Sequence, residues 1–219
     1  MNRVLALGIA CCSLASPALA DEPPETTLAP EVRAGIKGRF GSSSGIDGAE
    51  LAGLSYGLGA WLSPTRLYSL GLAWERGGLG SEHTGPSDNS LRVERSSDTL
   101  WLGGRAYPLR SDHLGLFVAL RLGATWQHLD ASGTRAGDGF GPGAVFSCSA
   151  SDGPGFALGG GVGLTLDIDR QLAFVTEVEG SAHRLTSEVL DGCAPGAGSV
   201  TAVGAHLGFA YRFDLGAAL

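Results

Sequence analysis

Residues 114–127 read LGLFVALRLGATWQ. Every second side chain from Leu114 to Trp126 is apolar, whereas the side chains between them are mostly small or polar and include Arg121. Successive side chains of a β-strand point to opposite faces, so this stretch predicts a strand with one wholly apolar face. A helix would surround Arg121 with leucines and give it no polar face to join.

The same alternation recurs along the chain and predicts eight strands. They cover residues 32–40, 50–62, 67–76, 97–108, 114–127, 155–169, 172–184 and 203–214. Trp101 fits the pattern of the fourth strand poorly. The clearest strands last ~10 residues or more, and a tilted strand needs about 9–11 to cross a membrane. Strands of globular proteins are shorter, typically about 5–6 residues.

The connections between these strands alternate in length. Short turns fall at residues 63–66, 109–113 and 169–171, and longer loops fall at roughly 41–49, 77–96, 129–153 and 186–198. This alternation is typical of transmembrane barrels. We predict an all-β fold, an eight-stranded antiparallel up-and-down transmembrane β-barrel over residues 31–215, with a C-terminal tail at 216–219. Both ends of the barrel would lie on the short-turn, periplasmic side.

Residues 1–20 have the features of a cleaved signal peptide, namely a basic start, an apolar run at 4–14 and Ala18-Leu19-Ala20. The run is shorter than the ~20 residues of a spanning helix, which disfavours a short membrane anchor. The cysteines at 11–12 leave a lipoprotein as a further alternative. Residues 21–30 would form a periplasmic N-terminal segment. Export to an oxidising compartment predicts a disulfide between Cys148 and Cys193, which lie in the third and fourth long loops.

Composition and motifs disfavour several classes of function. Only 17% of the residues are charged, and the formal net charge of −7 argues against a nucleic-acid partner. The five histidines show no metal-binding spacing. Two G-x-S-x-G matches fall in a loop and in a strand, not at the strand-to-helix turn that a nucleophile requires. We therefore expect no enzyme activity, no cofactor and no metal site.

The polar face of the strands would line the inside of the barrel. An eight-stranded barrel has room inside only for side chains, and inward glycines leave space for long charged ones. Because buried charges must be paired, we predict an ion network that plugs the lumen. It comprises Lys37, Arg39, Arg105, Arg121, Glu177 and Glu179. The alternative is a hydrated lumen with loose charges, that is, a narrow porin-like channel.

In these strands and connections, residues 31–215 resemble the small eight-stranded outer-membrane barrels of Gram-negative bacteria, of the OmpA or OmpX type. The resemblance implies a structural, adhesion or surface-interaction role, a monomer, an unknown surface ligand, and contact with outer-membrane lipid and lipopolysaccharide. Such barrels end in alternating apolar residues and an aromatic, which the barrel insertion machinery reads. The corresponding residues are Leu207, Phe209, Tyr211 and Phe213, although the chain continues past this aromatic.

Two other classes remain as alternatives. Some small outer-membrane barrels modify lipid A with a Ser–His pair on the rim, and His128 lies near Ser96, Glu94 and Asp98 on the expected strands. The tight His-x-Ser pattern of those deacylases is absent, so polar residues at the membrane boundary are the simpler interpretation. A soluble lipid-binding barrel such as a lipocalin should be apolar inside, whereas the ionisable residues here lie opposite the large apolar set.

Overall fold

The computed structural model describes residues 26–40, 52–84, 90–135 and 144–216. The predicted signal peptide lies outside these residues, as do residues 21–25 of the predicted N-terminal segment and residues 217–219 of the predicted tail. In the described part of the chain, no helix has the length and apolar character needed to cross a membrane.

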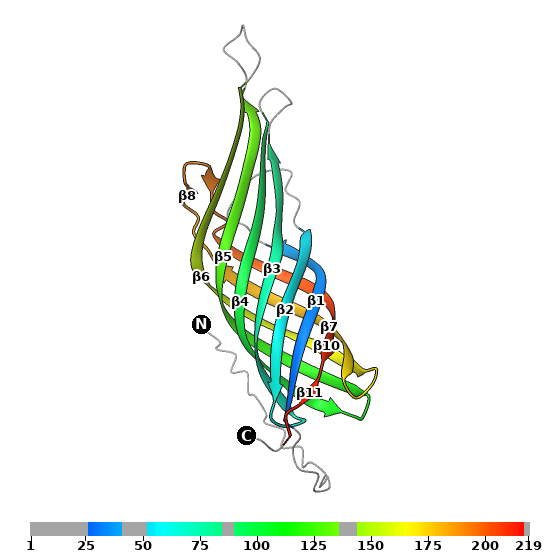
Figure 1. The fold of residues 1–219 in the computed structure, drawn as a ribbon. Coiled ribbons are helices and arrows are strands. Elements are labelled where there is room, and N and C mark those ends of the chain that lie inside the picture. Colours follow the sequence, from blue (N-terminus) through cyan, green and yellow to red (C-terminus); the bar gives the residue numbers. More distant parts are fainter. Residues whose placement is uncertain (1–25, 41–51, 85–89, 136–143, 217–219) are drawn as a thin grey trace, which may run out of the picture.

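Eight long antiparallel strands form a closed ring, which confirms the predicted fold (Figure 1). The ring strands are β1 (Thr27–Phe40), β2 (Ala52–Ser63), β3 (Tyr68–Thr84), β4 (Leu91–Arg110), β5 (Leu114–Arg135), β6 (Ala144–Asp167), β7 (Leu172–Arg184) and β10 (Ser199–Tyr211). Each strand pairs with its neighbour in the chain, and pairing of β1 with β10 closes the ring. Three short strands lie between or beyond them: β8 (Val189–Leu190), β9 (Ala194–Pro195) and β11 (Phe213–Asp214).

The short turns gather at one end of the ring, which we call the turn end. β1 begins at Thr27, earlier than the expected barrel start at residue 31, and pairs there with β11. In the turn between β6 and β7, the backbone N–H groups of Leu172 and Gln171 each donate to Asp169 Oδ1 at 2.7 Å. These two bonds favour the charged carboxylate and so hold the pKa of Asp169 below its usual value.

At the other end, strands β3 to β6 continue beyond the ring as an open four-stranded sheet, visible as the tall part of Figure 1. We call this sheet the wall; it comprises residues 78–84, 91–96, 128–135 and 144–155. Much of it falls in stretches that the sequence predicts as loops. The alternation persists there with its polarity reversed, because Glu94 and Asp130 face outward while Val93 and Leu129 are buried.

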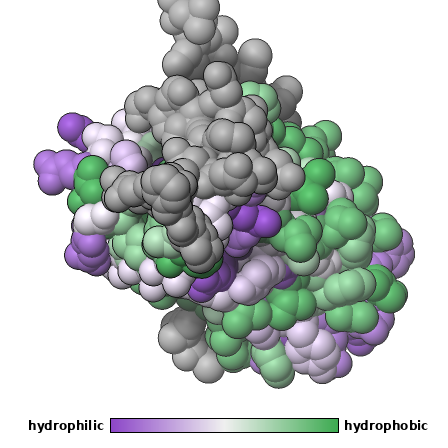
Figure 2. Space-filling model, turned by 90° about the horizontal axis from the view of Figure 1, so that it is seen from above, coloured by the Kyte–Doolittle hydropathy of each residue, from purple (hydrophilic) through white to green (hydrophobic). Residues whose placement is uncertain are grey.

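The outer surface of the ring is apolar. Exposed large side chains occupy the outward positions of the strands, among them Leu54, Ile36 and Leu120, which are 77%, 63% and 70% exposed. Figure 2 shows such side chains as green spheres along the flank of the molecule. Exposure of this kind is costly in water and favourable in lipid, which also requires the ring to satisfy its backbone groups internally.

Trp101 points into the lumen, where it is 1% exposed. Its indole ring needs the space that inward glycines leave: a Cβ on Gly123 would lie 2.8 Å from Trp101 Cε3 and 2.8 Å from the Leu100 carbonyl oxygen. A Cβ on Gly159 would also contact this ring. The interior is therefore filled by alternating very large and very small residues, as expected for a narrow barrel.

Gly163→Ala should destabilise the barrel. The new Cβ would meet Phe117 Cζ at 2.3 Å and the Thr176 carbonyl oxygen at 2.4 Å, so the backbone must shift. Such overpacking costs about 1–3 kcal/mol. Gly180→Ala is the matched control, because nothing lies within 4 Å of its added Cβ. Urea unfolding in lipid vesicles, followed by heat-modifiable gel mobility, compares the two. Equal stability of both variants would contradict the tightly filled lumen.

Candidate functional site

The lumen holds a network of charged side chains at mid-height. Among the described residues it contains four carboxylates and four cations, all buried. They are Glu31, Glu75, Glu177 and Glu179, with Arg33, Lys37, Arg105 and Arg121. Five of the six predicted network residues belong to it, because inward positions on β1, β4, β5 and β7 bring them to the same part of the lumen.

The contacts join strands that are not neighbours in the ring. Arg121 on β5 donates to both Glu177 and Glu179 on β7. Arg105 on β4 forms a two-pronged pair with Glu31 on β1, with nitrogen–oxygen distances of 2.6 and 2.8 Å. Lys37 Nζ contacts Glu75 and lies 3.1 Å from Glu179 Oε1. Each contact therefore passes through the interior past at least one intervening strand, and the contacts together link β1, β3, β4, β5 and β7.

Aromatic rings close the network toward the turn end. The guanidinium carbon of Arg105 lies 3.9 Å from the ring centroid of Trp61 and 4.6 Å from that of Phe117. A cation over a ring face gains about 0.5–2 kcal/mol, depending on its desolvation. Phe117 also contacts Tyr107, with centroids 5.7 Å apart. The rings thus fill the lumen beside the charges and hold Arg105 in place.

Arg39, the sixth predicted member, does not join this network. It pairs instead with Glu82 of β3 at 3.2 Å, and Arg95 of β4 contacts the second oxygen of the same carboxylate at 3.3 Å. This correction follows from geometry, since Arg39 lies near the wall end of β1, beyond Lys37. Glu82 and Arg95 were missed because the sequence pattern assigned both to a loop.

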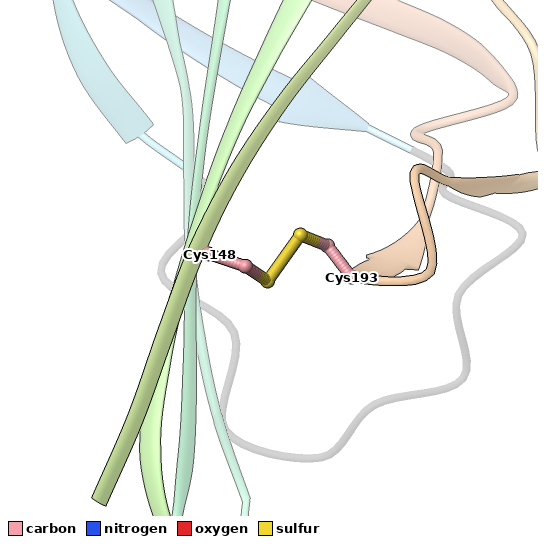
Figure 3. The surroundings of a disulfide bond; sticks show 2 residues. All are labelled: Cys148 and Cys193. Atoms are coloured by element: carbon pink, nitrogen blue, oxygen red, sulfur yellow. A yellow bond between two sulfur atoms is a disulfide. The ribbon is translucent and has the colours of Figure 1, made fainter.

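The segment 185–198 folds over the lumen at the wall end, and we call it the lid. Its residues Leu190 and Ala194 pack against the apolar inner side of the wall, at Val93, Leu129 and Ala150. The Cys148–Cys193 disulfide joins β6 to the lid, as predicted (Figure 3).

Two polar side chains of the wall and ring also hold the lid. Arg95 Nη1 donates to the Pro195 carbonyl oxygen at 2.5 Å. Gln127 accepts from the Ala197 backbone N–H at 2.9 Å and donates to the Thr186 carbonyl oxygen at 3.3 Å. The lumen is therefore covered at one end and crossed by ion pairs at its middle.

Sequence reasoning missed three further members of the network: Glu31, Arg33 and Glu75. Arg33 and Glu75 point inward, as the predicted residues do. What the sequence lacked was the register of the strands, which decides which inward side chains meet. Glu31 lies in β1, which begins earlier than predicted.

The four residues assigned to the insertion signal all face outward near the turn end. Phe209 contacts Phe174 with ring centroids 5.5 Å apart, and Tyr211 contacts Phe213 at 4.9 Å. Leu207 is exposed at the preceding outward position of the same strand. The group forms an apolar and aromatic surface at the end of the last ring strand, where the membrane interface would lie.

The rim residues considered for lipid A chemistry are partly assembled. His128 Nε2 lies 2.7 Å from Asp98 Oδ2, and Arg76 contacts the same carboxylate at 3.3 Å. Ser96 lies opposite His128 in the β4–β5 ladder, but within the described residues no hydrogen bond joins the two side chains. A nucleophile requires that contact with its base. The described contacts are an ion pair between Arg76 and Asp98 and a close contact of His128 with the same carboxylate.

One group of side chains has the composition of a metal site. Potential ligand atoms of Glu75, Glu179 and His206 lie within 4.8 Å of one another. The Lys37 ammonium already contacts both carboxylates, which places a positive charge where a metal ion would bind. These residues therefore fit the ion network better than a metal centre.

Arg121→Met should destabilise the barrel, because it leaves the Glu177 and Glu179 carboxylates without their main partner. Breaking a buried ion pair in this way costs about 3–5 kcal/mol. Adding Glu177→Gln to Arg121→Met should restore part of the loss. Arg184→Met, an exposed outward position on β7, is the control and should change stability by about 0.5 kcal/mol or less. Urea unfolding in vesicles measures all three; a loss for Arg121→Met no larger than that of the control would rule out the paired network.

No protein-family model and no curated protein matches the sequence, whereas several solved structures match the fold. A major outer membrane protein of Thermus thermophilus is 16% identical with a TM-score of 0.51, over 86% of this chain and 99% of that chain. OprG of Pseudomonas aeruginosa is 12% identical with a TM-score of 0.46, over 88% and 97% of the two chains. Neisserial surface protein A is 12% identical with a TM-score of 0.45, over 85% and 97%. The chain therefore has the fold of the outer-membrane β-barrel proteins.

Proposed function

We propose that this protein is a surface-contact barrel of the Gram-negative outer membrane whose lumen does not conduct. The observation that carries the proposal is the buried network of four carboxylates and four cations that crosses the lumen. This network favours a structural or adhesive role over transport.

Electrostatics explains why the lumen blocks ions. Every charge of the central network has an opposite charge in contact, so a passing ion would have to separate buried pairs. Separating such pairs in a low-dielectric interior costs several kcal/mol per charge. At the turn end there is a narrow cavity lined by Trp61, Tyr107 and Arg212, and its lining also includes Glu31 and Arg105 of the network.

The two ends of the barrel would meet different surroundings. The apolar ring would contact outer-membrane lipid and lipopolysaccharide, and the turn end would face the periplasm. The outward residues Leu207, Phe209, Tyr211 and Phe213 would serve the insertion machinery. The wall would then rise outside the cell, where its polar outer face suits water and binding partners. Binding sites set on rigid strands are well positioned for contact.

In planar bilayers the protein should give no stable single-channel currents. The Cys148→Ser/Cys193→Ser variant, which removes the covalent link between β6 and the lid, should also stay closed, because the ion network lies below the lid. A large-pore porin in the same bilayers is the positive control. Large, stable currents from the unaltered protein would overturn the closed-lumen proposal. Currents from the cysteine variant alone would assign closure to the lid instead of the network.

A further inference from the structure

The small cavity at the turn end lies inside the ring. Its lining residues come from β1, β2, β4, β6, β7 and β10, with Arg212 just after β10. It has a volume of about 20 Å³, which is enough for one water-sized group. Arg110 at its outer side is exposed, whereas Glu31 is only 4% exposed. The cavity therefore leads from the surface of the turn end toward the ion network.

The charged groups that line this cavity are unbalanced. Three of them are the guanidinium groups of Arg105, Arg110 and Arg212, whereas Glu31 is the one carboxylate among the described lining residues. Arg105 is paired with Glu31, and Arg212 is paired with Asp167 outside the lining. For Arg110, the described part of the chain supplies no carboxylate within ion-pair distance. One positive charge at the cavity is therefore left without a counter-charge.

Neutral groups hold Arg110 at the rim of the cavity. Its Nη1 donates to the Arg66 carbonyl oxygen at 3.0 Å, and its guanidinium carbon lies 4.9 Å from the ring centroid of Tyr107. A guanidinium group has five N–H donors, so several of them are available to an acceptor. An anion beside Arg110 would add a charge-assisted hydrogen bond without separating an existing ion pair.

A second donor, deeper in the barrel, also lacks an acceptor. Arg105 is 3% exposed, and both of its terminal nitrogens bind Glu31. Its Nε is buried and has no hydrogen-bond partner among the described residues. A buried donor without an acceptor costs about 1–3 kcal/mol. Because Arg105 lines the cavity, an oxygen atom that enters beside it can supply the missing bond.

The remaining lining is mostly aromatic or small and apolar. Trp61 and Tyr107 are 3% and 8% exposed. The apolar lining residues are Ala29, Ala173, Val175 and Ala210. Such surroundings disfavour a strongly hydrated anion, because its lost hydration would not be replaced. They suit an anion with one charge that is attached to a small apolar group.

We propose that this cavity binds the terminal carboxylate of a chain whose last residue is small and apolar. One carboxylate oxygen occupies the cavity beside Arg105, and the other binds Arg110 at the rim. The rest of the ligand stays outside the turn end, and the small volume leaves no room for a bulky group next to the carboxylate. The site goes beyond the surface-contact role proposed above, since it gives the opposite end of the barrel a partner of its own.

Size, charge and shape together select a carboxylate among the anions. A phosphate monoester has three free oxygens and a charge of about −1.5 to −2, which exceeds the one unmatched charge of Arg110. Chloride has the right charge but is a single centre. The planar carboxylate places one oxygen at each of two guanidinium groups, a geometry for which arginine is well suited.

The test uses the full protein in lipid nanodiscs, which leave the turn end open to solvent. The probe is acetyl-alanyl-alanine at physiological salt, so that chloride competes throughout, and binding is measured by saturation-transfer NMR. We expect saturable binding with the strongest transfer to the C-terminal methyl group, and no binding of the C-terminal amide. Arg110→Gln should weaken binding about two- to fivefold, as expected for a partly exposed ion pair. Arg170→Gln, an exposed arginine in the β6–β7 turn, is the matched control and should leave binding unchanged.

A second pair of variants separates the cavity from the basic surface around it. Ala29 lines the cavity opposite Trp61, so Ala29→Leu should fill it and abolish binding without changing the charge. Ala34→Leu, at an exposed outward position of the same strand, should bind normally. Heat-modifiable gel mobility shows that each variant is folded.

Three results would overturn the proposal: equal binding of the amide, equal binding by Arg110→Gln and the unaltered protein, or stronger competition by inorganic phosphate than by acetate. Absence of binding in a non-conducting barrel would remove only the carboxylate site, whereas bilayer currents would remove the proposed function.

Discussion

Closure of the sheet by β1 and β10 is the constraint on which the structure depends. Lipid offers no hydrogen-bond partners, so an open edge within the membrane would leave a row of unsatisfied backbone groups. Closure with eight strands fixes a narrow interior, and a narrow interior permits only close packing or paired charge. Close packing is achieved by Trp101 against Gly123 and Gly159, and the buried charges are paired in the central ion network. The wall lies beyond this constraint, so it can remain an open sheet.

The alternation of residues 114–127 and its repeats were enough to predict the ring, because lipid outside and crowding inside impose opposite demands on successive side chains. The wall was predicted as loops because its alternation is reversed. Water surrounds it, so Glu94 and Asp130 face outward while Val93 and Leu129 turn inward. Trp101 did not fit the expectation that only small or polar side chains face the interior. The glycines that make room for its ring lie on other strands, and the alternation within one strand does not show which glycines lie beside it.

The sequence was enough to predict a network of inward charges, but not which charges form ion pairs with each other. Inward charges could be assigned from parity, which found Lys37, Arg121 and Glu179. Which opposite charges pair depends on the stagger between strands whose side chains meet in the lumen. A single sequence does not specify this stagger. This is why Arg39 was placed with the wrong carboxylates. The disulfide was easier, since the predicted cleavage of residues 1–20 leaves two cysteines, and two cysteines allow only one pairing.

The distribution of the network along the chain bears on how the barrel assembles. Strands β1 to β4 contribute three cations and two carboxylates, and β5 to β7 contribute one cation and two carboxylates. Within the central network neither group of strands is neutral, and the excess charges of the two groups are opposite. Glu31 and Arg105 lie 74 residues apart, and Arg121 and Glu179 lie 58 apart. A half-inserted sheet would thus carry unmatched network charge at its inner face. The central network becomes neutral only when the two halves meet, so it favours completion of the ring.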